Sequence, residues 1–545
     1  MIKYLAIFLF WMLAFLPGQA QDLVTPSPLN SVYQYSVAVG ERSAYLWVPP
    51  DCRYVRGVIM SLSNLLERRW LEDPIIRKTA AEEGLAIIWV GPIVNPSKEI
   101  GKVIPLTSDM KPGALEALEK MLQDLAVESG YDEIAWAPFI SMGHSANGPF
   151  AWNIPNWNAG RTIAAIPIKT VPLPKLRFEG VPLCYIVGET TEWPQYRDGR
   201  PSDRDFFWPV VRDSAIALRA DNENNLVAVV TDPGGGHFDW SERQARFVAL
   251  YIHKACQYRL PKNAPAHGPV KLKPIQPESG WLTGTGGMEG DAFHAAPYKK
   301  YKGDPKKAYW FFDEETARAA VAFCGDRRKR EKQMLTFIQN DQLLPVAKQG
   351  FAPLVFKPEE DGVSFAVKGG FLAEMPAELK GAGSPLAHAP GAIQFSVITG
   401  PAVQTAPDSF RVQFDRWNTG GAIWLQEEQA GNDQYRHAVQ PGLLNIPVRL
   451  KEGQPQAIVF PPIPDQKAGT PSIELMANSN SGLPVDYYVI AGPAFIEGRR
   501  LVFTPVPIRS KYPVKITVVA YQWGRMTAPL YQSAAPVTRT FYLGR

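Results

Sequence analysis

The sequence predicts an α/β fold with a doubly wound, mainly parallel sheet, followed by two all-β, sandwich-like domains. Between residues 43 and 260, short apolar runs alternate with amphipathic segments, a pattern typical of a parallel sheet covered by helices on both faces. From residue 346 onwards, short runs of alternating polarity are separated by Gly, Pro, Asn and Asp, which is typical of antiparallel sandwiches.

The apolar runs predict the strands of the first domain, and the helical periodicity between them predicts its helices. The run at 85–90 (LAIIWV) is apolar throughout, as in a strand buried on both faces. In the segment 112–129, Leu115, Leu118, Leu122 and Leu125 share one helical face, and Pro112 suits the first turn. In chain order, strands are expected at 43–48, 57–62, 85–90, near 134–141, and at 162–168, 183–187 and 226–231, with helices at 73–83, 112–129, from 146, and at 241–256.

The chain after residue 260 divides into three parts. Segment 261–345 begins with a Pro- and Gly-rich stretch to about 290, interpreted as a wrapping linker, and continues with one or two helices at 306–339. Segment 346–455 is predicted to be a β-sandwich, with strands at 363–367, 393–398, 410–414 and 422–425. Segment 456–545 is expected to form six or seven short strands. Its stretches 481–485 and 491–494 resemble immunoglobulin-like modules of exported bacterial proteins.

Composition excludes several classes of protein. The 545 residues are 46% hydrophobic and 20% charged, so the chain as a whole is not disordered. Lys and Arg total 57 against 53 Asp and Glu, a net charge of +4. So small a surplus gives no reason to expect a nucleic-acid partner or a membrane-surface partner.

The first 20 residues predict a signal peptide. Lys3 supplies a positive charge, residues 4–16 form an apolar run, and Ala20 precedes the expected cleavage site. The run is shorter than the roughly 20 residues that a membrane-spanning helix needs, although an uncleaved anchor is the alternative. We therefore expect a bacterial protein that is periplasmic or secreted, without a membrane partner after cleavage.

No metal or cofactor motif is present in the sequence. The four cysteines, at positions 52, 184, 256 and 324, lack the spacing of a zinc or redox motif. No glycine-rich phosphate-binding loop follows a suitable strand. The sequence therefore predicts chemistry without a metal or cofactor.

The stretch 139–148 (FISMGHSANG) has the pattern of a nucleophile on a tight turn. An apolar run leads into Gly143-His144-Ser145, and a segment compatible with a helix follows. On such a turn the Ser145 hydroxyl projects above the sheet edge, and the backbone N–H of Ala146 can help to bind an oxyanion. Gly143 avoids a collision with the opposite arm of the turn.

These residues resemble the nucleophile elbow of the α/β-hydrolase superfamily. The resemblance implies an α/β-hydrolase fold with a mainly parallel sheet over about residues 21–260 and a serine nucleophile at Ser145. One departure is that Asn147 replaces the usual second glycine, with Gly148 one position later. An elbow serine also needs a base and an acid.

His237 is the predicted base. It follows three glycines in the stretch 232–240 (DPGGGHFDW), after the last expected strand and before a helix. The chain has only 7 histidines, and this one lies in a loop able to bring its ring over the sheet. A turn or capping histidine is the alternative.

The acid is expected after the strand 183–187, which gives the superfamily's order of Ser, acid and His. Glu189 lies at the strand's tip and Glu192 farther into the loop. Glu192 is preferred because such acids usually reach from the loop, and Glu189 stays open as an alternative. The carboxylate would orient the imidazole and stabilise its charged form.

Further residues are assigned from their positions around this constellation. The second oxyanion donor is expected from the backbone N–H of Asn64 or Leu65, after the strand 57–62. Aromatic and arginine side chains near the site suit a sugar substrate. The candidate substrate-binding residues are Trp193, Tyr196, Arg197, Trp240 and His144.

We therefore expect an exported serine esterase that acts on an ester-bearing polysaccharide. The combination with β-sandwich modules resembles secreted bacterial carbohydrate esterases and polyester-depolymerase-like and feruloyl-esterase-like proteins. Two alternatives stay open: a serine peptidase with the same triad, and an inactive hydrolase domain that only binds glycan. The sequence does not choose an oligomeric state.

Overall fold

The computed structural model describes residues 29–92, 106–189, 192, 207–263, 265, 268–285, 294–325, 330–345, 350–377, 381–416 and 420–545. The predicted signal peptide at 1–20 therefore lies outside the described residues. Within these ranges, none of the helices has the length and apolar character needed to span a membrane. All four cysteines are described, and each is buried as a free thiol.

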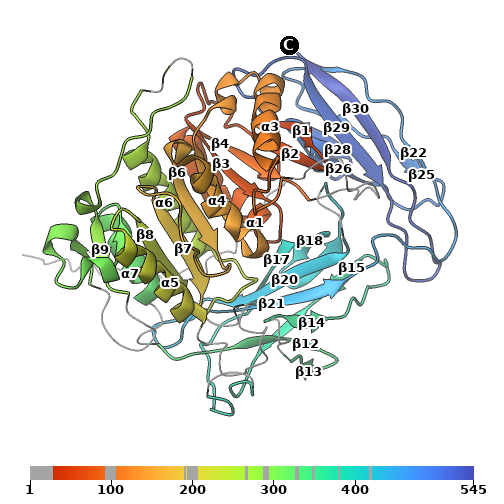
Figure 1. The fold of residues 1–545 in the computed structure, drawn as a ribbon. Coiled ribbons are helices and arrows are strands. Elements are labelled where there is room, and N and C mark those ends of the chain that lie inside the picture. The colour runs from red at the N-terminus through yellow and green to blue at the C-terminus, as the bar shows by residue number, and fades with distance from the viewer. Residues whose placement is uncertain are drawn as a thin grey trace, which may run out of the picture.

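An eight-stranded sheet forms the first half of the molecule (Figure 1), in the order β1-β2-β4-β3-β5-β6-β7-β8. The first two strands and the β2–β4 pair are antiparallel, and all pairs from β4 through β3 to β8 are parallel. The predicted α/β class with a mainly parallel sheet is thereby confirmed. The strands are β1 (Tyr35–Val39), β2 (Arg42–Trp47), β3 (Gly57–Leu62), β4 (Leu85–Val90), β5 (Phe139–His144), β6 (Thr162–Ile168), β7 (Leu183–Gly188) and β8 (Val227–Asp232).

Both faces of this sheet are covered. Along β4, Ile87 packs in the same apolar cluster as Ile76 of α2 (Pro74–Glu83), whereas Ile88 packs with Leu122 of α3 (Ala114–Ser129). Since successive side chains of a strand point to opposite faces, α2 and α3 lie on opposite sides of the sheet. Helix α6 (Glu242–Arg259) packs beside α2. Every residue of β3 to β8 is buried, which explains their continuous apolar runs.

Local signals in the chain explain where two of these helices begin or end. Asp73 accepts hydrogen bonds from the N–H groups of Ile75 and Ile76 and so caps α2, which ends at Gly84 with a positive φ of 67°. Ser241 caps α6 by accepting from the N–H of Gln244. The other helices of this half are α1 (Glu67–Leu71), α4 (Gly148–Asn158) and α5 (Phe207–Asp221).

One local prediction was wrong. The expected strand at 134–141 is a 3₁₀ helix, Asp132–Ala135, followed by β5 from Phe139. A short apolar run there was long enough to suit either structure. The segment 306–339, where one or two helices were expected, contains one helix, α7 (Glu314–Gly325), between the strands β11 (Tyr309–Phe311) and β12 (Leu335–Gln339).

The segment after α6 packs against the large sheet instead of only wrapping it. A small sheet in the order β10-β9-β11 joins β9 (Trp281–Thr283), β10 (Ala296–Pro297) and β11. Trp310 and Phe312 belong to the same apolar cluster as the side chains of β7 and β8. This segment therefore extends the core at the β8 edge.

The second half consists of small β-sheets, as the sequence predicts. The portion of the chain from β12 to β21 is called the middle part. It contains a four-stranded sheet, β14-β21-β20-β17, and the three-stranded sheets β15-β19-β18 and β13-β12-β16. Their strands are β13 (Gln342–Leu343), β14 (Ala352–Leu354), β15 (Ser364–Ala366), β16 (Lys368–Phe371), β17 (Gln394–Thr399), β18 (Ala402–Ala406), β19 (Ser409–Val412), β20 (Ala422–Gln429) and β21 (Ala438–Asn445).

The C-terminal part contains a four-stranded sheet β23-β30-β29-β26, a three-stranded sheet β24-β28-β27 and the pair β22-β25. Its immunoglobulin-type topology stays a prediction. The strands are β22 (Ile458–Val459), β23 (Gln466–Lys467), β24 (Ser472–Glu474), β25 (Asn478–Ser479), β26 (Asp486–Ala491), β27 (Ala494–Glu497), β28 (Arg500–Phe503), β29 (Val514–Tyr521) and β30 (Val537–Gly544).

The two β parts contact different regions of the large sheet's domain (Figure 1). The C-terminal part lies beside β1 and α3, where Arg509 pairs with the buried Glu133 at 2.8 Å. The middle part lies beside the ends of β7 and β8, where Arg436 pairs with Glu189 at 2.6 Å. The middle part therefore borders the edge at which the predicted catalytic residues lie.

Candidate active site

Ser145 occupies a strained turn between β5 and α4. The strand ends at His144, a single 3₁₀ turn spans Ser145–Asn147, and α4 begins at Gly148. Ser145 has a φ of 52°, which is unfavourable for any residue with a side chain. A Cβ atom on Gly143 would lie 2.1 Å from the carbonyl oxygen of Asn147, so the turn has room only for glycine there. The tight turn predicted from the sequence is present.

Asn147, the departure from the elbow pattern, holds the turn against the neighbouring strand. Its amide donates to the carbonyl oxygen of Ser63 at 2.7 Å and to that of Leu62 at 3.3 Å. The glycine one position later also has a packing reason, because a Cβ atom on Gly148 would lie 2.2 Å from the Thr170 side chain. The amide bulk at position 147 is therefore accommodated without opening the turn.

Three of the predicted site residues form one hydrogen-bonded chain. The Nε2 atom of His237 lies 2.8 Å from the Oγ atom of Ser145, and its Nδ1 atom lies 2.8 Å from Oε2 of Glu192. The other carboxylate oxygen of Glu192 accepts a hydrogen bond from the N–H of Gly188, at the end of β7. These side chains come from the ends of β5, β7 and β8, which meet at one edge of the parallel sheet.

Glu189, the alternative acid, points elsewhere. Its Oε1 atom pairs with Arg436 of the middle part, and its Oε2 atom accepts from the N–H of Gly234 at 2.6 Å. The structure thus places Glu192, and not Glu189, against the imidazole.

Burial shifts the pKa values of His237 and Glu192. Removal from water lowers the pKa of His237 well below its usual range, and nearby Lys169 lowers it further. Burial also raises the pKa of Glu192 to about 7, against the opposing effect of Lys169. The resting imidazole is therefore neutral, which is the form that can accept a proton from a hydroxyl.

Lys169 is a site residue that the sequence analysis missed. It follows β6 directly, is fully buried, and donates from Nζ to the backbone oxygen and to a carboxylate oxygen of Asp239, each at 2.9 Å. Asp239 in turn accepts from the N–H of Gly236, so this buried pair fixes the loop that contains His237. A lysine directly after a wholly apolar strand was the available signal, because an unpaired buried ammonium is costly.

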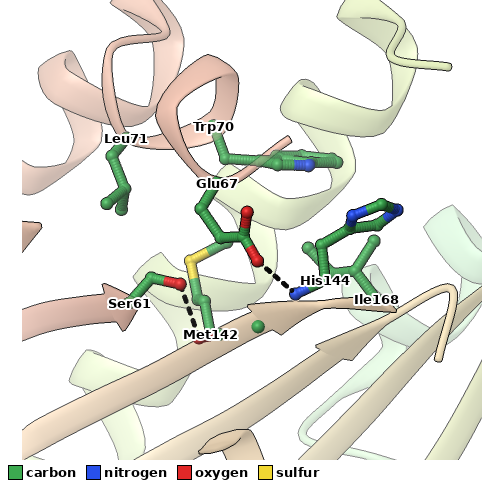
Figure 2. Close-up of a pocket in the computed structure, with 8 residues that line it drawn as sticks. Ser61, Glu67, Trp70, Leu71, Met142, His144 and Ile168 are labelled. Atoms are coloured by element: carbon green, nitrogen blue, oxygen red, sulfur yellow. Dashed lines mark hydrogen bonds between the residues drawn. The ribbon is translucent and has the colours of Figure 1, made fainter. Parts of the chain in front are cut away.

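The backbone N–H groups of Asn64 and Leu65, predicted as second oxyanion donors, donate to a carboxylate instead. One carboxylate oxygen of Glu67 accepts from the N–H of Asn64 at 2.9 Å and from the N–H of Leu65 at 2.8 Å. Figure 2 shows the other carboxylate oxygen accepting from the N–H of His144 at 3.0 Å, beneath the indole of Trp70. The assignment of Asn64 or Leu65 as an oxyanion donor therefore does not fit this arrangement. Ala146 is exposed, and its N–H belongs to the first turn after β5.

Two predicted substrate contacts are buried instead. His144 is 1% exposed, and its Nε2 atom lies 2.8 Å from the backbone oxygen of His237, beneath the site. Trp240 is also 1% exposed and packs under the guanidinium of Arg69, 4.1 Å from the ring centroid. Both side chains support the histidine loop from below. The remaining predicted contacts, Trp193, Tyr196 and Arg197, lie outside the described residues.

Comparison with known proteins gives similarity in structure only. No family model matches the chain, and no curated protein matches it by sequence. One similar solved structure is an S-formylglutathione hydrolase from Agrobacterium tumefaciens, with 12% identity, a TM-score of 0.29, and coverage of 41% of this chain and 92% of that one.

Two other solved structures are similar over the same share of the chain. A poly(3-hydroxybutyrate) depolymerase from Bordetella parapertussis has 14% identity and a TM-score of 0.28, and covers 42% of this chain and 91% of its own. Est1E from Butyrivibrio proteoclasticus, solved with ferulic acid bound, has 13% identity and a TM-score of 0.26, and the match covers 40% of this chain and 96% of Est1E.

Proposed function

We propose that this protein is a serine hydrolase that cleaves carboxylic esters. The observation that supports this most strongly is the chain from Ser145 through His237 to Glu192, with both hydrogen bonds at 2.8 Å and Ser145 on a strained turn. A nucleophile, a neutral base and an acid that orients the base are the parts that acyl transfer needs.

The proposed reaction proceeds in two halves. His237 accepts the proton of the Ser145 hydroxyl while Oγ attacks the ester carbonyl, and the N–H of Ala146 donates to the resulting oxyanion. The protonated imidazole then gives its proton to the departing alcohol, which leaves an acyl group on Ser145. Water attacks this acyl-enzyme with His237 again as base, which releases the acid and restores the serine.

For the substrate, we propose an ester-bearing polysaccharide outside the cytoplasm. Support comes from the predicted signal peptide and from the aromatic and arginine residues of the stretch 193–208. In that proposal Trp193, Tyr196 and Arg197 contact the sugar.

The test compares substrates on the purified protein and on a Ser145→Ala variant. We expect release of acid from short-chain nitrophenyl esters and from acetylated or feruloylated glycans, at rates that the variant reduces by about a million-fold. Cleavage of peptide amides with glycan esters left intact would instead identify a peptidase. Retention on glycan affinity gels without hydrolysis of any ester would identify a binding protein.

A further inference from the structure

The loop that contains His237 is held from outside by the middle β part of the chain. Strand β20 presents alternate side chains of Trp424, Gln426 and Glu428 on one face, as the two-residue period of a strand requires. Trp424 stacks on Phe238 with ring centroids 4.7 Å apart, and the Phe238 ring meets the His237 ring edge-on at 4.6 Å. Phe238, the residue next to His237, is thus packed against the middle part.

Gln426 makes the most specific of these contacts. Its Oε1 atom accepts from the backbone N–H of Trp240 at 3.0 Å, and its Nε2 atom donates to the backbone oxygen of Trp240 at 2.8 Å. The same Nε2 atom donates to Glu428 at 3.0 Å, which fixes the orientation of the amide. Gln426 is 1% exposed, so no water competes for these bonds. One side chain therefore satisfies both backbone groups of a residue three positions after the histidine.

The start of the loop is held in the same way. A Cβ atom on Gly234 would lie 2.0 Å from the backbone oxygen of His437, so the loop and the residue before β21 approach as closely as a glycine allows. Glu189 accepts from the N–H of Gly234 and pairs with Arg436. Both ends of the loop are thus attached to the β20–β21 region.

These attachments matter because the loop has little stiffness of its own. Residues 234–236 are all glycine, which loses more conformational freedom on ordering than any other residue. A base must be held within about half an ångström of its working position, and a displacement of about 1 Å can lower a rate about 100-fold.

We propose that the middle β part positions the catalytic histidine and that Gln426 is its main positioning residue. This inference rests on the proposed function. The hydrolase-like sheet fixes Ser145 and the inner side of the loop through Lys169 and Asp239, whereas Gln426 fixes the outer side.

The test is a Gln426→Ala variant in the full chain, with Gln440→Ala as its matched control. Gln440 is a buried glutamine of the adjacent strand β21, and among the described residues its amide donates to the backbone oxygens of Gly350 and Pro441, both within the middle part. For each protein one would measure the folded fraction, kcat and KM for a nitrophenyl ester, and the rate at which a fluorophosphonate labels Ser145.

We expect the Gln426→Ala variant to lose about tenfold to 100-fold in kcat and in labelling rate per folded molecule, with KM within about twofold. The Gln440→Ala control should have the kcat and the labelling rate of the parent protein. If Gln426→Ala does not fold, Gln426→Met keeps the side-chain volume and removes the same hydrogen bonds. Parental rates in a folded Gln426 variant would overturn the positioning role alone, whereas an unlabelled parent protein would overturn the proposed function itself.

Discussion

At the scale of single residues, the two glutamates after β7 have different environments, which predicts different effects of the same substitution. Glu192→Gln keeps the shape but removes the charge that stabilises the imidazolium, and its amide can hold the ring in the wrong tautomer. We expect kcat for a nitrophenyl ester to fall by about 10²- to 10⁴-fold.

Glu189→Gln is the matched control, because its carbonyl oxygen can still accept from the N–H of Gly234 and only the charge facing Arg436 is lost. Its kcat should fall by no more than about tenfold, because the hold of Glu189 on the start of the histidine loop is weakened and not removed. A larger loss in Glu189→Gln than in Glu192→Gln would reverse the assignment of the acid.

His144 gives a pH-dependent prediction. Burial, together with His237 nearby, lowers the pKa of His144 well below the unfolded value of 6.5. Below that pH the unfolded chain binds a proton that the folded protein does not, so the stability associated with the neutral ring is present above pH 6.5 and is lost as pH falls. A His144→Gln variant lacks this loss and can still donate to the backbone oxygen of His237.

We therefore expect the destabilisation caused by His144→Gln to be smaller at pH 5.5 than at pH 7.5 by about 1.4 kcal/mol. Chemical unfolding of both proteins at the two pH values measures this difference. An equal destabilisation at both values would mean that His144 is charged in the folded protein or exposed to water.

At the scale of elements, the elbow depends on the absence of a side chain at position 143. In Gly143→Ala the new methyl group would lie 2.1 Å from the backbone oxygen of Asn147, so the turn must open and Ser145 must move away from His237. We expect at least a tenfold loss of kcat and a lower midpoint of thermal unfolding.

Gly160→Ala is the control for that substitution, because a Cβ atom there would meet only the Asn158 side chain, at 3.5 Å. Its stability should stay within about 0.5 kcal/mol of the parent. A Gly143→Ala protein with parental activity would show that the turn is looser than described.

Elements buried on both faces could be predicted well from the sequence. The expected strands at 57–62, 85–90 and 162–168 coincide with β3, β4 and β6, because burial on both faces requires a continuous apolar run. Helix α5, Phe207–Asp221, was not among the expected helices.

The structure brings predicted site residues together where one local pattern was sufficient to point to them. Ser145 and His237 each lie in a glycine-containing turn after a strand. The roles of Asn64 and Leu65 were assigned wrongly because Glu67, three residues after Asn64, caps these N–H groups, and Lys169 was missed because its partner Asp239 is distant in sequence. Glu67 is thus a local partner that was overlooked, whereas the pair of Lys169 with Asp239 is formed only by the tertiary fold.

At the scale of the whole molecule, an ion pair between Arg509 of the C-terminal part and Glu133 of the large sheet's domain joins the two. Glu133 is 3% exposed and accepts from the N–H of Val55 and from Arg509. Arg509→Met would leave this carboxylate without its cation, at a cost of about 1–3 kcal/mol in the free energy of unfolding. Activity should not change, because the pair lies at the α3 side of the sheet and not at the edge that holds Ser145.

Arg500→Met, which removes the exposed pairs with Glu474 and Glu497 and an exposed hydrogen bond to Ser472, should cost less than about 0.5 kcal/mol. Chemical unfolding and nitrophenyl ester hydrolysis measure both effects. Equal destabilisation by the two substitutions would contradict a specific contribution of the Arg509–Glu133 pair.

The most direct test of the central claim is covalent labelling of Ser145. The purified protein would be treated with a fluorophosphonate, digested, and analysed by mass spectrometry beside a Ser145→Ala variant of equal folded fraction. Our account predicts a single phosphonylated residue at Ser145, with labelling absent from the variant. An unmodified Ser145 in the well-folded parent protein would contradict the account.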